Sequence, residues 1–130
     1  EAVVTVRPRP RPKFTDHLTW SSDGRHRHDD KLILRAALVH LPQAQEILYQ
    51  MDVPLSATIT PFIGHPDRGG LKMAEPRRVE NIQPSEFGVA EWTVSMHCLP
   101  RSFDVWFEVL CDKSVEPECR RLLGKRTVHL

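Results

Sequence analysis

The stretch GVAEWTVSMHCLPRSFDVWFEVLC, residues 88–111, decides the fold of this chain. Apolar side chains alternate with polar ones on both sides of the short break Pro100-Arg101-Ser102, and they fall into two sets: Ala90, Trp92, Val94, Met96 and Cys98, then Phe103, Val105, Phe107, Val109 and Cys111. A period of two puts each set on one face of a β-strand. Two such runs joined by a short turn predict an antiparallel hairpin with one buried face.

The same reasoning predicts further strands on either side of this stretch. Residues 55–63 alternate apolar and polar side chains and predict a half-buried strand. Residues 31–41 form a nearly continuous apolar run that suits a helix or a strand, and we favour a buried strand. Residues 14–20 suit a short edge strand, and residues 126–130 suit a last strand. The chain is therefore expected to be rich in antiparallel sheet.

The remaining segments predict a helix, a loop and a helical turn. Ala44, Ile47, Leu48 and Met51 follow helical spacing after Pro42, which predicts a short helix over residues 43–51. Residues 64–84 hold three prolines and three glycines among many charges, and we expect a long irregular connection there. Residues 115–123 suit a helical turn that ends at Gly124.

Composition limits the chain to one modest domain. It has 130 residues, of which 40% are hydrophobic, and its 18 basic and 17 acidic residues leave a net charge of +1. No apolar run approaches the roughly 20 residues that span a bilayer, so no membrane partner is expected. The chain begins at Glu1 without an initiator Met, and we interpret it as a piece of a longer protein. The expected fold is a β-sandwich-like or β-rich α+β domain over residues 14–130 with one short helix.

An extended basic arm is predicted at residues 1–13. Its residues 7–13 read Arg-Pro-Arg-Pro-Arg-Pro-Lys, and alternating proline favours polyproline II geometry and excludes the interior of a sheet. If the termini lie side by side, this arm and the C-terminal cations could form one patch. The candidate partner-binding residues are therefore Arg7, Arg9, Arg11, Lys13, Arg120 and Arg121. We favour docking on protein over contact with phosphates.

Trp106 is a further candidate because it lies on the mostly polar face of its strand, together with Leu110. An exposed aromatic side chain on a strand is typical of an interaction surface. A second covered face of the sheet explains the same pattern equally well. Both interpretations remain open at the level of sequence.

No side-chain cluster carries a trusted catalytic or metal-binding pattern. His26, His28, Asp29 and Asp30 stand close together, but their spacing differs from the His-x-His-x-Asp-His pattern of metallo-β-lactamases, and we interpret them as a solvated loop whose metal binding is left open. The three cysteines lie 13 and 8 residues apart, without the tight C-x₂₋₄-C spacing of a structural zinc site. No signature of a cysteine or serine nucleophile is present. We therefore expect no catalytic residue, no metal and no cofactor.

The odd cysteine count favours a reducing, intracellular compartment, although one disulfide plus one free thiol is an alternative. We expect Cys98 and Cys111 to be reduced, buried and slow to react, because both fall on apolar strand faces. Cys119 stands among charged residues and should be the most reactive thiol.

These observations favour a non-catalytic protein-interaction or structural module within a larger protein or assembly, bound to a protein partner or to other subunits. The first alternative is a nucleic-acid-associated structural subunit of a ribonucleoprotein or a virus, which would use its basic arm and tail. The second alternative is a small metal-dependent or cysteine enzyme.

Overall fold

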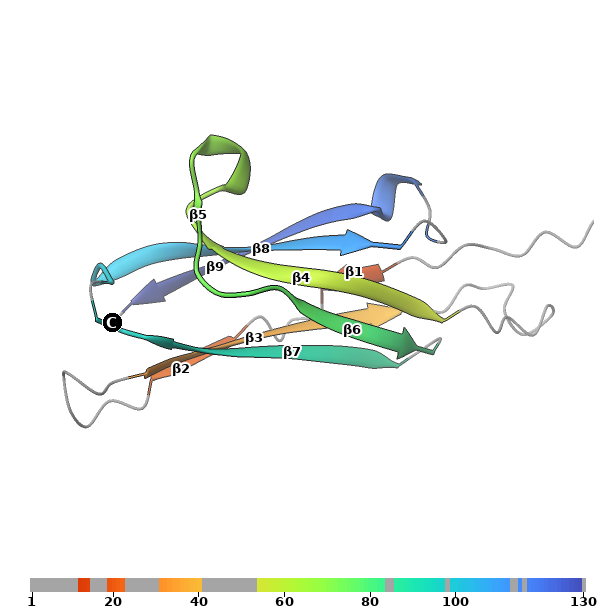
Figure 1. The fold of residues 1–130 in the computed structure, drawn as a ribbon, viewed down its shortest axis with the longest axis horizontal. Coiled ribbons are helices and arrows are strands. Elements are labelled where there is room, and N and C mark those ends of the chain that lie inside the picture. Colours follow the sequence, from red (N-terminus) through yellow and green to blue (C-terminus); the bar gives the residue numbers. More distant parts are fainter. Residues whose placement is uncertain are drawn as a thin grey trace, which may run out of the picture.

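The computed structural model describes residues 12–14, 19–22, 31–40, 54–83, 86–97, 99–112, 115 and 117–129. Its strands are β1 (Pro12–Phe14), β2 (Thr19–Ser22), β3 (Lys31–His40), β4 (Leu55–Ile63), β5 (Leu71–Lys72), β6 (Arg77–Ile82), β7 (Phe87–Ser95), β8 (Ser102–Cys111) and β9 (Arg121–His129). Two single 3-10 turns, η1 (Pro66–Arg68) and η2 (Pro117–Cys119), are the helical elements of the described chain. The predicted β-rich fold is confirmed, since the strands form two antiparallel sheets (Figure 1).

The first sheet, sheet A, is built around β3. On one side β3 pairs with β7 along almost its whole length. On its other side it pairs with β2 through residues 32–35 and with β1 through residues 38–40, so β1 and β2 share one edge. The apolar run predicted as a buried strand at residues 31–41 therefore contains the central strand β3 (Lys31–His40). The edge strand expected at residues 14–20 corresponds to the shorter pieces β1 and β2.

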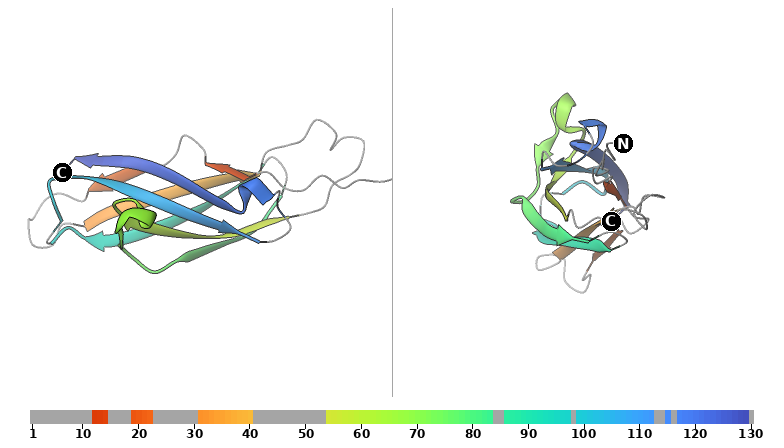
Figure 2. Two further views of the ribbon diagram at one scale, coloured as in Figure 1. Left: turned by 90° about the horizontal axis from the view of Figure 1, so that it is seen from above. Right: turned by 90° about the vertical axis from the view of Figure 1, so that its right-hand side faces the viewer.

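The second sheet, sheet B, is built around β4 and β8. These two strands pair with each other, and β9 pairs with the free side of β8. β5 and β6 pair with successive parts of β4 on its other side. The views in Figure 2 show the two sheets lying face to face as the layers of a sandwich.

The predicted hairpin of residues 88–111 is wrong in its pairing, although both of its strands exist. β7 pairs with β3 in sheet A, whereas β8 pairs with β4 and β9 in sheet B. The chain therefore passes from one sheet to the other between Ser95 at the end of β7 and Ser102 at the start of β8. Strand alternation shows which face of a strand is buried, but it does not show which strand lies beside it. The apolar faces of β7 and β8 meet the same core in either case, as neighbours in one sheet or as members of two facing sheets. β3 and β4 are divided between the sheets in the same way, a crossed arrangement that is typical of Greek-key sandwiches.

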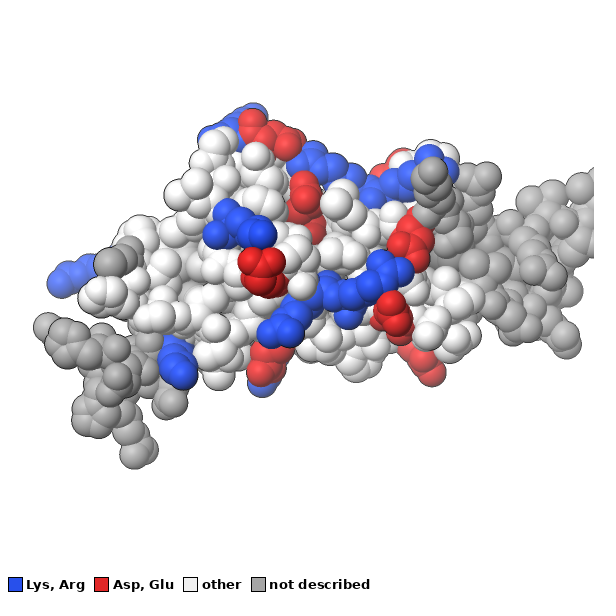
Figure 3. All heavy atoms as spheres, viewed as in Figure 1, with Lys and Arg blue, Asp and Glu red and all other residues white. Residues whose placement is uncertain are grey.

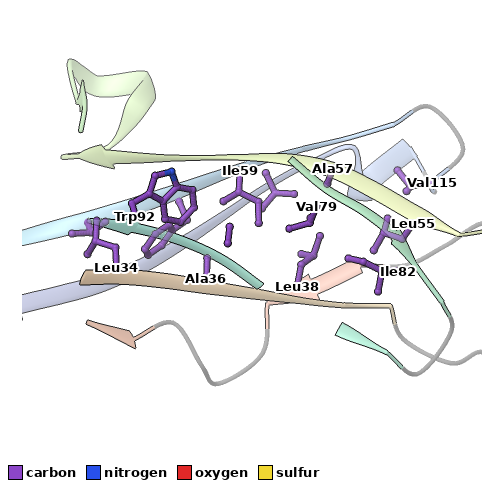
Figure 4. Packing of buried hydrophobic residues seen from close by; sticks show 14 of the residues in the cluster. Leu34, Ala36, Leu38, Leu55, Ala57, Ile59, Val79, Ile82, Trp92 and Val115 are labelled. Carbon is purple, nitrogen blue, oxygen red and sulfur yellow. The ribbon is translucent and has the colours of Figure 1, made fainter. Parts of the chain in front are cut away.

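The core lies between the sheets and contains the predicted apolar side chains. Ala90 and Trp92 of β7 are buried, and so are Val105, Phe107 and Val109 of β8. The ring of Trp92 lies 5.8 Å from that of Phe107, centroid to centroid, which joins the two layers. Figure 4 shows the core extending along the sandwich, with labelled members that include Leu34, Leu38, Leu55, Ile59, Val79 and Ile82.

The long irregular connection predicted for residues 64–84 is also wrong, because it contains β5 and β6. Val79 and Ile82 of β6 are both buried although they are three residues apart. A register shift against β4 allows this, and Asn81 in the shifted region has a left-handed φ of 56°. Its N–H donates to the Ser56 hydroxyl oxygen at 3.2 Å. The bulge breaks the two-residue period by which the strand could have been recognised.

β6 and β7 bring the two sheets close together along one side of the sandwich. A Cβ atom added to Gly88 of β7 would lie 2.8 Å from Cδ1 of Ile82 in β6. Glycine at this position therefore permits the close approach of two strands from different sheets.

The C-terminal prediction is wrong in its boundaries. η2 covers residues 117–119 alone, β9 begins at Arg121, and Gly124 lies inside β9 opposite Phe107. The predicted helix at residues 43–51 and the loop with His26, His28, Asp29 and Asp30 lie outside the described residues. In the part of the chain that is described, no helix is long and apolar enough to cross a membrane.

Candidate interaction surfaces

Trp106 lies on the outer face of sheet B and is partly covered by its own chain. The register pairs it with Phe62 of β4 and with Lys125 of β9. The ring of His65 lies 4.5 Å from the Trp106 ring at an interplanar angle of 58°, and the Lys125 ammonium lies 5.7 Å from the ring centroid. These contacts favour the covered-face interpretation of Trp106, since a cation and a second ring already occupy its surroundings. A contact between Trp106 and a partner stays a prediction.

The cover is supplied by residues 64–70, here called the β4–β5 loop, which rises above sheet B next to β5 in Figure 1. Gly64 and Gly69 adopt left-handed φ values of 82° and 83°. A Cβ atom added to Gly70 would lie 2.3 Å from the Gly64 carbonyl oxygen, so the backbone doubles back too tightly for any side chain there. The Gly70 N–H donates to the His65 carbonyl oxygen at 2.9 Å. Glycine thus fixes the shape of this loop.

Arg121 anchors the β4–β5 loop to sheet B. Its guanidinium donates to both carboxylate oxygens of Asp67 at 2.8 and 2.7 Å, and to one oxygen of Glu108 at 3.0 and 2.8 Å. The hydrogen bonds from Arg121 hold the pKa of Asp67 below its ordinary value, and the two carboxylates raise the pKa of Arg121. The charge of Arg121 is therefore compensated by two carboxylates of the same chain. This makes the Arg121 guanidinium poorly suited to binding a phosphate. Figure 3 shows the same intermixing of basic and acidic side chains across the visible face.

The other predicted partner-binding residues are divided by the structure. Arg7, Arg9 and Arg11 lie outside the described residues. Lys13 is an exposed residue of β1, where it pairs with Val39 at the edge of sheet A. The carbonyl oxygen of Arg120 accepts the Cys111 N–H at 2.8 Å.

Figures 1 and 2 place β1 at the same end of the sandwich as η2 and the start of β9. The last residue of the predicted arm, Lys13 in β1, thus lies at the same end as Arg121 at the start of β9. The expected boundary between arm and domain at residue 13 stays a prediction, although Pro12 and Lys13 already pair with β3.

The outer face of sheet A carries an apolar patch that was not predicted from the sequence. We call Val39, Phe87 and Val89 the Phe87 patch. Phe87 is 63% exposed and Val89 is 50% exposed, and the register places Val39 directly opposite Phe87. Ala37 stands opposite Val89 on the same face. The signal was present in the sequence: residues 87, 89, 91, 93 and 95 form one face of β7, and that face is apolar in its first two positions.

The charges on this face are mostly basic. Arg35 and Glu91 stand opposite each other and form an ion pair at 2.5 Å. Lys13 lies next to Val39 across the β1–β3 pair, and Lys31 lies at the far end of β3. The face therefore combines an apolar area with an excess of positive charge.

The described cysteines, Cys111 and Cys119, are thiols, and both are half-buried. Burial raises the pKa of the Cys111 thiol to about 12, and the neighbouring Cys119 and Asp112 add to this effect. Cys98 lies outside the described residues. Within the described ranges, no group of three His, Cys, Asp or Glu side chains is placed to hold a metal ion.

No protein-family model matches the chain, and no curated protein matches it.

Proposed function

We propose that the chain is a non-catalytic protein-interaction module of a larger protein or assembly, and that the Phe87 patch is its contact surface. The observation that carries this proposal is the exposure of two large apolar side chains, Phe87 and Val89, on neighbouring outward positions of one strand. Single exposed apolar residues are ordinary on protein surfaces, whereas contiguous apolar patches are typical of interaction sites. A buried aromatic anchor is also the usual centre of a protein interface.

The nucleic-acid alternative has weaker support. β1, which contains Lys13, lies at the same end of the sandwich as the start of β9, which contains Arg121, and this favours a basic patch. Against this, Arg121 is bonded to Asp67 and Glu108, and the ring of Trp106 is engaged by His65 and Lys125. Bases stack on accessible aromatic rings, whereas the Trp106 ring is already in contact with His65 and Lys125.

The enzyme alternative also has weak support. A nucleophilic cysteine needs a lowered pKa and an exposed thiol, whereas the pKa of Cys111 is raised by burial. The thiol of Cys111 is instead consistent with the reducing intracellular compartment that we propose for this module.

The experiment is a comparison of native complexes. The chain and its Phe87→Glu/Val89→Glu variant are expressed in the source cells, and gentle extracts are separated by gel filtration. We expect the unaltered chain to elute with a larger species that protease destroys and nuclease leaves intact, and the variant to elute as the free domain. Elution of both proteins at the size of the free domain, or a complex that nuclease dissolves, would contradict the proposal.

The matched control is Leu71→Glu. Leu71 is 69% exposed but lies in β5 of the other sheet. This variant should keep the large species. Circular dichroism of each purified variant shows whether it has folded.

A further inference from the structure

We infer that the partner of the Phe87 patch is an acidic protein segment with apolar anchor residues. This inference rests on the proposed function and goes further by naming the chemistry of the partner. It is carried by the apolar side chains of the patch, by the charges around them and by the position of β1.

The apolar requirement follows from the patch itself. Phe87 and Val89 are cross-strand neighbours of Val39 and Ala37, so apolar side chains adjoin one another across the two strands. Ala37 is buried and Val39 is half-buried, while the side chains on β7 stand out from the sheet. A partner gains most by placing its own apolar side chains against Phe87 and Val89, because these two lose the most exposed surface on binding.

The acidic requirement follows from the surrounding charges. The outward positions of β1, β3 and β7 carry three basic residues, Lys13, Lys31 and Arg35, and one acidic residue, Glu91. The excess is three minus one, or two positive charges. Glu91 is already paired with Arg35, so the two lysines at opposite ends of the face are the charges that a partner meets. Carboxylates that flank an apolar centre would complement both of them.

The same charges disfavour two other occupants. A second copy of the chain would bring two positively charged faces together, which costs free energy. A nucleic acid would satisfy the charges but would leave Val39 and Val89 against polar groups, with Phe87 as the single ring of the patch on which to stack.

The test is a selection of peptides from a random library displayed on phage, with the full chain as bait. We expect the enriched peptides to combine Asp or Glu with large apolar residues. A synthetic peptide of the enriched sequence is then titrated by fluorescence anisotropy. Phe87→Ser should weaken its binding at least about tenfold. Lys13→Glu/Lys31→Glu should weaken it as well and make it less dependent on salt. Leu71→Ser is the control and should leave it unchanged.

Four outcomes would overturn the inference. Enriched peptides that lack acidic residues would refute the charge argument, and binding unchanged by Phe87→Ser would refute the site. A dimer that Phe87→Ser dissociates in sedimentation equilibrium would identify a second copy as the occupant. Ile47 and Leu48 are apolar residues of the helix predicted over residues 43–51. Peptides that are enriched by an Ile47→Ser/Leu48→Ser variant but not by the unaltered chain would show that this segment of the chain itself occupies the Phe87 patch.

Failure of the inference is distinguishable from failure of the proposed function. If the native complex depends on Phe87 while the selected peptides are not acidic, the interaction module stands and the partner chemistry is wrong. If the native complex is absent, the module itself is wrong.

Discussion

Replacing Phe107 with alanine tests the core on which both sheets depend. Phe107 is 1% exposed at the centre of β8, where it pairs with Pro61 of β4 and Gly124 of β9. Its ring also packs on Trp92 of the opposite sheet. Phe107→Ala therefore removes a contact between the layers.

The expected loss of stability can be worked out from the buried area. A buried aromatic side chain removes at least about 150 Å² from water, and at about 25 cal/mol per Å² this corresponds to about 4 kcal/mol. Measured substitutions of buried phenylalanine by alanine cost about 3–5 kcal/mol, since a cavity is left behind. We expect Phe107→Ala to fall in this range.

The assay is urea denaturation followed by circular dichroism, with Phe87→Ala as the matched control. Phe87 undergoes the same chemical change at a position that is 63% exposed, so its loss should stay within about 0.5 kcal/mol. A loss below about 1 kcal/mol for Phe107→Ala, or equal losses for the two variants, would refute the placement of Phe107 between the sheets.

Three further predictions concern the β4–β5 loop and the thiols. Gly70→Ala should loosen the β4–β5 loop, because the added Cβ atom would collide with the Gly64 carbonyl oxygen. Amide hydrogen exchange should become faster in this loop while the core strands stay protected. Unchanged exchange in the loop would contradict the close approach of Gly70 to Gly64. Arg121 lowers the pKa of Asp67 below 3.8, so their pairing stabilises the fold above that pH and is lost as the pH falls through the lowered pKa. The difference in stability between the unaltered chain and Asp67→Asn should therefore disappear in acid. A difference that persists at low pH would count against the ion pair. Burial raises the pKa of Cys111 from 9.0 to about 12, so iodoacetamide should modify this thiol slowly near neutral pH in the native state and rapidly in urea, as measured by mass spectrometry. The contribution of the buried Cys111 thiol to stability should decrease as the pH rises above 9.0. Fast alkylation of the native protein would contradict the burial of Cys111.

The fold class could be predicted from the sequence because strand alternation reports burial directly. The alternating faces of residues 88–111 and 55–63 meet the core as expected, and residues 31–40 form a central strand. The period of two has this power because one face of each strand is buried and the other is not.

The pairing of strands could not be predicted in the same way. An alternating strand has the same pattern whether the next strand in the sequence lies beside it or in the opposite sheet. The passage from β7 to the other sheet before β8 therefore leaves no signal in the pattern. β6 escaped recognition because the bulge at Asn81 puts Val79 and Ile82 out of phase. The C-terminal strand was shortened because Gly124 was interpreted as a helix stop, whereas it lies within a ladder.

The candidate surfaces depend on tertiary structure to an even greater degree. Trp106 was singled out correctly as an outward-facing residue, but the loop that partly covers it folds back from the end of β4. The carboxylates that bind Arg121 come from positions 67 and 108, which the sequence does not place nearby, and its contact with a partner stays a prediction. The Phe87 patch needs the β3–β7 register, because Val39 and Phe87 are brought together by that pairing.

The most direct test of the central claim is photo-crosslinking from the patch itself. A benzoylphenylalanine residue replaces Phe87 in the full chain, a second protein carries it at Leu71, and both are irradiated in the source cells. We expect the Phe87 position to yield a discrete adduct that contains a second polypeptide, and the Leu71 position to yield none of comparable intensity. Equal labelling from both positions, or an adduct that nuclease removes, would contradict the assignment of this face as a protein-binding surface.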